Sequence, residues 1–318
     1  MNNRKAPDSY NGLLLIDKPL GMTSHGIVQK LRRLLNQKKI GHVGTLDPLA
    51  TGLLVLCLGS GGKIARFLTE YDKTYKAQVR LGIRSETYDA EAVTDEQIRN
   101  AKAPDITRQQ LDDALATFVG DIRQQAPAYS AIKLNGQPLY RSARKGEHIT
   151  PPVRNVTIHH IDEVNFDSPH LSFTVSCSKG TYIRSLAHDI GERLGCGAYL
   201  SGLRRMTVGK LALANALTLE EVERLVESQQ LQMRIISPVE ALNLPSLVVS
   251  DSFALRVADG LRPSSSDIEK INGDFDAGAY VLLIGKNNSA LAVGVSEVNS
   301  NEIALTTRRP IYRHVRVM

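Results

Sequence analysis

The stretch GHVGTLDPLATGLL, residues 41–54, most constrains how this chain can fold. It places a single acid, Asp47, between a glycine-containing turn and the apolar run Leu53–Leu58. An apolar run of this length, bounded by turn residues, indicates a strand that is buried on both faces. The sequence therefore predicts a carboxylate at the edge of a packed core. Asp-Pro also favours turn initiation, so a plain turn stays open as the alternative.

Strands and helices alternate through the larger part of the chain. Apolar or alternating patterns predict strands at 13–16, 74–83, 156–166 and 171–177. Four helices are predicted from their start signals: a cap at Ser24, capping boxes at Thr107–Gln110 and Thr218–Glu221, and an apolar series from Ile183 that stops at Gly195.

The pattern changes after Pro245. Short apolar segments at 247–249, 280–284, 291–298 and 303–306, separated by Gly and Asn turns, predict a small all-β module. We therefore predict two domains, residues 1–246 and 247–318. The first contains a basic insertion at about 124–154 without a sustained period, which is typical of a segment that orders on a partner.

Charge and cysteine content exclude few classes of protein. The chain has 39 Lys and Arg against 33 acids, a net charge of +6, which suits a phosphate-backbone partner but does not require one. The three cysteines are far apart, and no Cys or His spacing indicates a metal site. Because no signal core or long apolar run is present, we expect a cytoplasmic protein without a membrane span.

The segment GSGGK, residues 59–63, suggests a phosphate-binding loop. Such a loop needs a glycine where Cys57 stands and a Ser or Thr where Ile64 stands, so a phosphotransferase is rejected. No dinucleotide fingerprint or nucleophile elbow occurs either. The sequence predicts no cofactor.

Arg184 lies in the first turn of a predicted helix, where the helix dipole disfavours a cation by a few tenths of a kcal/mol. An arginine at this position needs an anion opposite it, and Asp47 is the obvious candidate. Such a pair would keep the carboxylate ionised and fix its direction.

Five separate blocks of the chain, in order and at matching spacing, resemble the TruB family of tRNA pseudouridine-55 synthases. They extend from Leu13 to Arg205 and read LLLIDKPLGMTSHGIVQKLRR, GHVGTLDPLATGLL, YKAQVRLG, PAYSAIKLNGQPLYRSAR and CSKGTYIRSLAHDIGERLG, followed by LRR. One departure is Tyr199, where the family often has a histidine.

The resemblance implies a cofactor-free isomerisation of uridine 55 in the tRNA T-loop. The N1–C1′ bond breaks, the base turns, and it rejoins the sugar through C5. Asp47 then acts as the catalytic carboxylate at the sugar or the base, with Arg184 as its partner. Tyr75 resembles the ring that stacks on the displaced base, although an alternating strand alone would make it a core aromatic.

The target base must leave the RNA fold to reach the acid. His42 resembles the residue that fills the vacated space, and Leu203 the side chain that packs on the base. Lys18 resembles a support of the site wall, and Tyr182 is grouped with the RNA-binding residues. Taken alone, His42 is an ordinary loop residue and Leu203 a core residue.

The insertion at 124–154 matches the family's thumb, which clamps the T-stem-loop. Its cations then become phosphate contacts, which give affinity without sequence choice. They are Lys133, Arg141, Arg144, Lys145 and Arg154, with the run Lys30–Lys39 as a further source.

The resemblance implies an α+β fold of the pseudouridine synthase type, a mixed and mostly antiparallel sheet with flanking helices. It also implies a PUA-like RNA-binding module at the C-terminus and a monomer that binds tRNA. Two alternatives are kept. One is an RNA chaperone that folds tRNA without essential catalysis. The other is a guide-RNA-dependent synthase, which no Lys-rich tail or docking extension supports.

Overall fold

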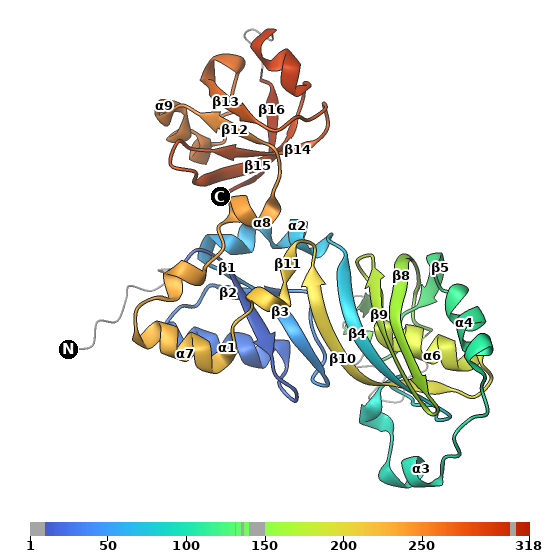
Figure 1. The fold of residues 1–318 in the computed structure, drawn as a ribbon. Helices are drawn as coiled ribbons and strands as arrows, with labels where there is room; N and C mark the ends of the chain where they lie inside the picture. Colours follow the sequence, from blue (N-terminus) through green and yellow to red (C-terminus); the bar gives the residue numbers. More distant parts are fainter. Residues whose placement is uncertain (1–9, 131, 135–136, 140–149, 306–309) are drawn as a thin grey trace.

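The computed structural model describes residues 10–130, 132–134, 137–139, 150–305 and 310–318, which form a larger and a smaller body (Figure 1). The larger body is built on a nine-stranded sheet in the order β1-β3-β10-β4-β9-β8-β5, with β2 beside β3 and β11 beside β10. β3 and β10 pair in parallel, and the other pairings described in this sheet are antiparallel. The predicted α+β class is confirmed.

The strands of this sheet are β1 (Gly12–Lys18), β2 (Ile40–Val43), β3 (Ala50–Leu58), β4 (Lys73–Leu81), β5 (Gly120–Gln125), β8 (Val153–Asp167), β9 (His170–Cys177), β10 (Ala198–Val208) and β11 (Leu211–Ala212). The helices of the larger body are α1 (Ser24–Leu34), α2 (Ala65–Thr69), α3 (Asp95–Asn100), α4 (Arg108–Ala116), α6 (Ile183–Arg193), α7 (Leu219–Glu227) and α8 (Pro238–Leu242).

The predicted strands and helices of the larger body are confirmed, with one correction at α1. The helix begins at Ser24, but its cap is Thr23, whose hydroxyl accepts a hydrogen bond from the Gly26 amide at 2.9 Å. The Ser24 hydroxyl is instead bonded to the backbone of Leu46. Ser24 therefore connects α1 to the Asp47 loop rather than capping its own helix.

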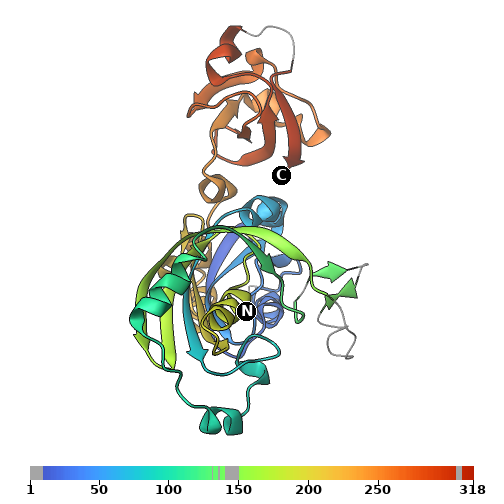
Figure 2. The ribbon, with the colours of Figure 1, turned by 90° about the vertical axis from the view of Figure 1, so that its right-hand side faces the viewer.

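The apolar run in β3 is buried on both faces, as predicted. Leu54, Leu56 and Leu58 belong to a core with α1, α4, α6 and α7, around which the sheet curves (Figure 2). Leu53 and Val55 belong to a second core on the opposite face, with α2, α8 and strands of the C-terminal module. Two covered faces explain why this strand shows no alternation of polar and apolar residues.

The C-terminal module is a five-stranded, mostly antiparallel sheet in the order β13-β12-β14-β15-β16, with a short helix α9 (Asp251–Ala254). Its strands are β12 (Ser246–Val249), β13 (Ile268–Asn272), β14 (Tyr280–Ile284), β15 (Ala290–Ser296) and β16 (Tyr312–Val317). The predicted β-rich module is confirmed, whereas its division from the larger domain at 246/247 stays a prediction.

One predicted strand of the module, 303–306, is wrong over its described residues. Ser300–Leu305 is a 3₁₀ helix, labelled η7, and residue 306 lies outside the described part. The Glu302 carboxylate accepts from the Asn299 amide at 3.3 Å, which favours a helical turn. β13 and β16 were not predicted, because polar and charged residues interrupt their apolar patterns.

None of the helices in the described part of the chain is both long and apolar enough to span a membrane.

Candidate active site

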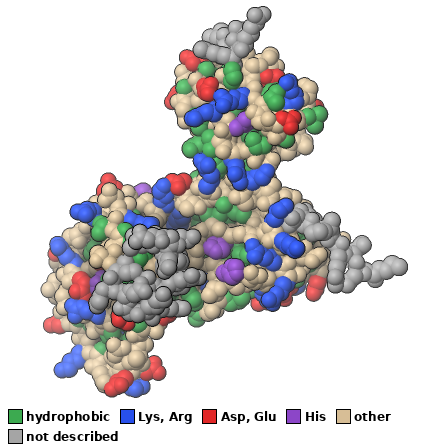
Figure 3. All heavy atoms as spheres, turned by 180° about the vertical axis from the view of Figure 1, so that it is seen from behind, with side chains coloured by type: hydrophobic (Ala, Val, Ile, Leu, Met, Phe, Trp, Pro, Cys, Tyr) green, Lys and Arg blue, Asp and Glu red, His purple; other side chains and the backbone are tan. Residues whose placement is uncertain are grey.

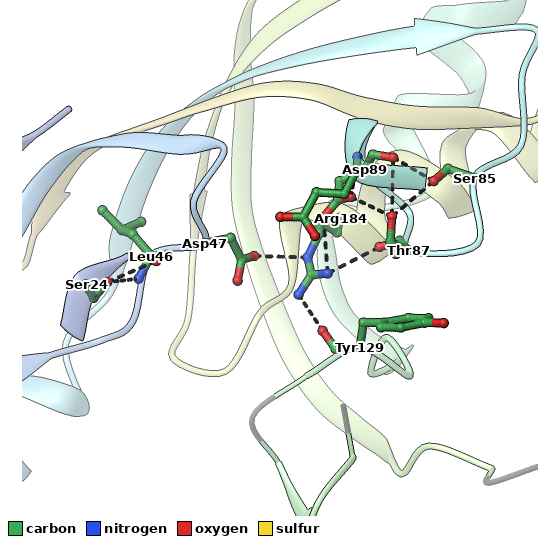
Figure 4. A network of polar contacts seen from close by, with 9 residues as sticks. Ser24, Leu46, Asp47, Ser85, Thr87, Asp89, Tyr129 and Arg184 are labelled. Carbon is green, nitrogen blue, oxygen red and sulfur yellow. Dashed lines mark hydrogen bonds and ion pairs between the residues drawn. The ribbon is translucent and has the colours of Figure 1, made fainter. Parts of the chain in front are cut away.

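The loop between β2 and β3 carries Asp47 and is held on both sides of that residue. The Ser24 hydroxyl accepts from the Leu46 amide at 2.8 Å and donates to the Leu46 carbonyl at 2.9 Å (Figure 4). On the other side, the Gly21 amide donates to the Pro48 carbonyl at 2.9 Å. These bonds fix the backbone next to the acid.

Lys18 lies behind this loop and is fully buried. Its Nζ donates to the carbonyls of Met22 at 2.5 Å, Pro19 at 3.0 Å and Pro48 at 3.4 Å, so its three donors are used. Burial lowers the pKa of Lys18, and the nearby Asp47 carboxylate opposes this effect. Lys18 therefore ties the end of β1 to the loop from behind.

Arg184, in the first turn of α6, faces Asp47. Its Nε lies 3.1 Å from Asp47 Oδ2, so the expected ion pair is present (Figure 4). Nη1 lies 3.3 Å from Asp89 Oδ2 and donates to the Thr87 carbonyl at 3.2 Å. Nη2 donates to the Tyr129 carbonyl at 2.9 Å. Four acceptors from three separate segments therefore hold the guanidinium in one orientation.

Asp89 is the second carboxylate on this guanidinium and is almost fully buried. The Thr87 hydroxyl donates to Asp89 Oδ1 at 2.5 Å, and the Glu91 amide donates to the same oxygen at 3.0 Å. Both oxygens of this buried carboxylate therefore have polar partners, Oδ1 with Thr87 and Glu91 and Oδ2 with Arg184.

Asp47 differs from Arg184 in exposure. Its side chain keeps 40% of its surface open, against 7% for Arg184. Burial by the surrounding loop raises the pKa of Asp47 above the ordinary aspartate value, Arg184 opposes this, Asp89 adds to it, and Lys18 lowers it. The acid is thus enclosed by protein on most sides but still open to a reactant.

The open side of Asp47 faces a cavity of about 470 Å³. This volume lies in the ~300–1,000 Å³ range of pockets that hold small organic groups. Five of the predicted site residues line it: Asp47, Tyr75, Tyr182, Arg184 and Leu203.

Strand pairing brings Tyr75 and Leu203 to this cavity. Tyr75 of β4 lies opposite Arg205 of β10, and Leu203 lies opposite Ala77 of β4. Tyr75 is only 8% exposed, and burial raises its pKa, which keeps the phenol protonated. The cavity therefore has an aromatic and an aliphatic wall, both carried by the central sheet.

Tyr182 precedes α6 and is held by its backbone. Its amide donates to Gln124 Oε1 at 2.8 Å, and Gln124 Nε2 donates back to the Tyr182 carbonyl at 3.0 Å. This exchange joins the start of α6 to the end of β5, where the predicted insertion begins.

His42 does not line the cavity. It is half-buried in β2, and burial, with Arg205 and His25 nearby, lowers its pKa. Its Nδ1 is buried with no hydrogen-bond partner in the described residues. Its predicted role therefore needs the RNA to reach β2, beyond the cavity itself.

The predicted thumb lies partly outside the described residues, which leave out 131, 135–136 and 140–149. Lys133 belongs to the short hairpin of β6 (Lys133–Leu134) and β7 (Gln137–Pro138), whereas Arg141, Arg144 and Lys145 lie outside the described part. Arg154 is exposed in β8. The roles of these cations stay predictions.

Part of the cationic run at 30–39 is used within the fold. Lys30 forms an ion pair with Glu223 of α7 at 2.9 Å, and Arg32 donates to the Ile40 carbonyl at 2.7 Å. These two cations stabilise the packing around α1, which leaves them less available for a phosphate.

Three residues of the site were missed from the sequence: Asp89, Tyr129 and Arg205. Asp89 follows a short turn after β4, and the sequence around it has no motif that indicates a site residue, apart from a Thr two positions earlier. Tyr129 contributes a carbonyl, which no side-chain pattern reveals. Arg205 is 1% exposed and donates to the carbonyls of Leu53 at 2.7 Å and Gly44 at 2.9 Å. It follows a second arginine, Arg204, in the strand sequence AYLSGLRRMTV, so no local pattern distinguished it.

Within GSGGK, Gly61 has a packing role. Residues 59–64 form a 3₁₀ helix, and a Cβ on Gly61 would lie 2.1 Å from the Gly12 carbonyl oxygen of β1. Glycine is therefore required for close approach of two backbones. In the described part of the chain no cluster of three His, Cys, Asp or Glu residues could hold a metal ion.

Comparison with known proteins gives matches over most of the chain. The family model for the TruB family pseudouridylate synthase (N terminal domain) matches residues 32–183, and that for the tRNA pseudouridylate synthase B C-terminal domain matches residues 184–243. The tRNA pseudouridine synthase B of Dechloromonas aromatica (strain RCB) is 46% identical over 262 residues, which are 82% of this chain and 86% of that protein.

A longer match is found in Cupriavidus metallidurans, whose tRNA pseudouridine synthase B is 42% identical over 287 residues, 89% of this chain and 90% of that protein. Among solved structures, a Cbf5-Nop10-Gar1 complex contains a chain with a TM-score of 0.74 and 25% identity, covering 96% of this chain and 84% of that one. With adjoining family models and relatives of this identity and coverage, the chain belongs to the TruB family of pseudouridylate synthases.

Proposed function

We propose that this protein isomerises uridine 55 in the T-loop of tRNAs to pseudouridine, with Asp47 as the catalytic carboxylate. The observation that supports this most is the Asp47–Arg184 pair, at 3.1 Å, on the wall of a 470 Å³ cavity. Relatives at 42–46% identity are named tRNA pseudouridine synthase B, which supports tRNA as the substrate.

The reaction is an isomerisation, so no other molecule has to supply a group. It needs a carboxylate held in a fixed position beside the uridine. The N1–C1′ bond breaks, a C5–C1′ bond forms, C5 loses its proton and N1 regains one, so the product is an isomer. A carboxylate held in direction by Arg184 can attack C1′ of the sugar or the turned base, and Tyr75 can stack on that base. Flipping the uridine costs a few kcal/mol, which contacts to the cavity must offset.

We propose that the insertion at 124–154 and the C-terminal module bind the tRNA. The insertion leaves the sheet between β5 and β8, and its short β6–β7 hairpin projects from the larger body at the right of Figure 2. On the face shown in Figure 3, Lys and Arg side chains lie on both bodies and near their junction. A PUA-like role of the module and phosphate contacts by Lys133, Arg141 and Arg144 complete this proposal, with the protein acting as a monomer.

The experiment measures tritium released from tRNA that carries 5-tritiated uridine. C5 loses its hydrogen only when the new carbon–carbon bond forms, so release reports isomerisation directly. Wild type, Asp47→Asn and the exposed α4 variant Asp113→Asn are compared, each with tRNA binding measured separately. A tRNA transcript with cytidine in place of uridine 55, called the position-55 transcript, tests whether uridine 55 is the base that reacts.

We expect release by wild type and Asp113→Asn, none by Asp47→Asn, and none from the position-55 transcript. Tight binding without release by any variant would support the chaperone instead. Release that requires an added guide RNA would support the guide-dependent alternative. Undiminished release from the position-55 transcript would overturn the assignment of uridine 55.

A further inference from the structure

Residues 84–89 (RSETYD) run along α6 in the opposite direction to the helix and touch it at three places. The helix contributes side chains four residues apart, which share one face: Arg184, His188 and Glu192. From the start of α6 onward, their partners in the 84–89 segment are Asp89, Tyr88 and Arg84.

The three contacts differ in exposure. At the far end, Arg84 Nε lies 2.6 Å from Glu192 Oε1, but these side chains are 63% and 40% exposed, and such pairs contribute little. In the middle, the rings of Tyr88 and His188 are stacked at 3.9 Å between centroids and 12° between planes, with both residues half-buried. The Tyr88–His188 stack is therefore closer to the Arg184 contact than the Arg84–Glu192 pair is, and it is better shielded from solvent than that pair.

The backbone at Tyr88 is strained. Its φ is +63°, in the left-handed region, which costs a residue with a Cβ roughly 1–2 kcal/mol. Because of this turn, the Thr87 carbonyl and the Asp89 carboxylate both face Arg184 Nη1, at 3.2 and 3.3 Å. The Tyr88 carbonyl accepts from the Leu200 amide of β10 at 3.0 Å. The strained residue thus sets the geometry of two of the acceptors that hold the guanidinium.

His188 contributes little other than its ring to this contact. Its Nδ1 is buried and has no hydrogen-bond partner in the described residues. Burial lowers the pKa of His188, Glu192 opposes this and Arg84 adds to it, so the ring that meets Tyr88 is predominantly neutral. Stacked aromatic rings contribute about 0.5–1.5 kcal/mol beyond their buried area, comparable to the strain at Tyr88.

We infer that Tyr88 and His188 are positioning residues for the reaction of this site. Their stack stabilises the left-handed turn at Tyr88, which holds Thr87 and Asp89 against Arg184 and so fixes the direction of the Arg184–Asp47 pair. The inference rests on the proposed function, because it assigns these residues an effect on the step in which Asp47 acts. Neither ring lines the cavity, so their effect reaches the reactant only through Arg184.

The test compares Tyr88→Ala, Tyr88→Phe, Tyr88→Gly and His188→Ala in the full-length protein. Tritium release at saturating and limiting tRNA gives kcat and KM, kcat is followed between pH 5 and 9, and the Tm of each variant is recorded. Arg84→Ala is the matched control, since it removes the exposed contact of the same segment.

For Tyr88→Ala and His188→Ala we expect kcat to fall about tenfold with KM within about twofold, the loss of rate that follows from roughly 1.4 kcal/mol. The acid limb of the kcat profile should move to higher pH, because a displaced Arg184 no longer favours the Asp47 carboxylate. Tyr88→Phe should restore rate and profile, and Arg84→Ala should stay within about twofold of wild type.

The inference is overturned if both alanine variants keep the wild-type kcat and acid limb, or if Arg84→Ala reproduces their loss. Tyr88→Gly removes the ring and also relieves the strain, so it should lose less rate than Tyr88→Ala; an equal or larger loss would also overturn the inference. If Tyr88→Ala does not fold, the kcat and acid limb of His188→Ala decide whether the inference holds. That variant removes the stack but keeps the same residue at position 88. Wild type that releases no tritium would instead refute the proposed function.

Discussion

At the scale of single residues, the site is a balance of opposing effects on one carboxylate. Burial raises the pKa of Asp47, and Arg184 lowers it, with a net rise. A carboxyl group whose pKa is higher in the folded than in the unfolded chain binds its proton more tightly when folded. Its ionised form then destabilises the fold increasingly as pH rises from the unfolded pKa through the folded pKa.

We therefore expect Asp47→Asn to be slightly more stable than wild type at neutral pH. The amide carries no charge to desolvate, and Asp89 still balances Arg184. Scanning calorimetry at pH 7.5 should show a Tm higher by roughly 1–3 °C, with the difference vanishing near pH 3.8, the ordinary aspartate pKa. A wild type that is the more stable protein at pH 7.5 would show that the ion pair outweighs the burial of the acid.

The second residue-scale prediction concerns Arg184→Gln. Losing the guanidinium removes the larger of the two cations' effects that lower the pKa of Asp47, so the acid limb of the kcat profile should move to higher pH. At pH 7 we expect kcat to fall by roughly 10²-fold, the size of effect seen when one preorganised hydrogen-bond donor is lost. Arg193→Gln, at the exposed end of the same helix, serves as the control and should leave the profile in place.

At the scale of elements, the parallel seam between β3 and β10 carries the site. Its register places Leu203 beside Ala50 and Arg205 beside Gly52. Gly52 has a φ of +93°, and a Cβ there would lie 2.4 Å from the Arg205 carbonyl oxygen and 2.8 Å from its amide nitrogen. The seam therefore depends on glycine at this position, and the Arg205 contacts depend on the seam.

Gly52→Ala should lower the free energy of unfolding by about 2–4 kcal/mol, because a backbone clash and a disfavoured φ act together. Gly62→Ala is the matched control, since its φ is not positive and no atom lies within 4 Å of the added Cβ. Urea unfolding followed by circular dichroism measures both variants. Equal urea midpoints for Gly52→Ala and wild type would mean that β3 and β10 can move apart at this position without a loss of stability, which would contradict the prediction.

At the scale of the whole molecule, the two bodies share a core. Leu282, Ile284 and Val293 of the C-terminal module pack with β1, β3 and α2 of the larger body. At the edge of this contact the rings of Phe67 and Tyr280 meet at 5.4 Å and 79°. Shared apolar burial couples the stability of the two bodies.

We expect the protein to unfold in one cooperative transition despite its two bodies. Leu282→Ala should lower its Tm as a single unit, because removing a fully buried leucine side chain costs about 2–5 kcal/mol. Leu255→Ala, whose leucine is 82% exposed, should leave the Tm unchanged within about 1 °C. Two resolved calorimetric peaks, with only one of them shifted by Leu282→Ala, would contradict the coupling.

The amino-acid sequence by itself determined much of the local structure and singled out Asp47, whose catalytic role is a proposal. Capping boxes at Thr107 and Thr218, the apolar run of β3 and the turn around Asp47 depend on neighbours a few residues away. Such signals can be interpreted without knowing the fold. The predicted strand at 303–306 was wrong because local signals are weak there. Four residues are too few to show whether the apolar pattern repeats as in a strand or as in a helical turn.

Only the tertiary structure decided which groups hold Arg184 and Arg205 in place. Arg184 contacts Asp89 across 95 positions of sequence, and Arg205 contacts the Gly44 carbonyl across 161. A buried ion pair is stabilising only when both partners are brought together and both are fully hydrogen-bonded. That condition depends on how β3, β4, β10 and α6 pack. The sequence could therefore name Asp47, whereas the residues that hold its partner in place became identifiable only from the fold.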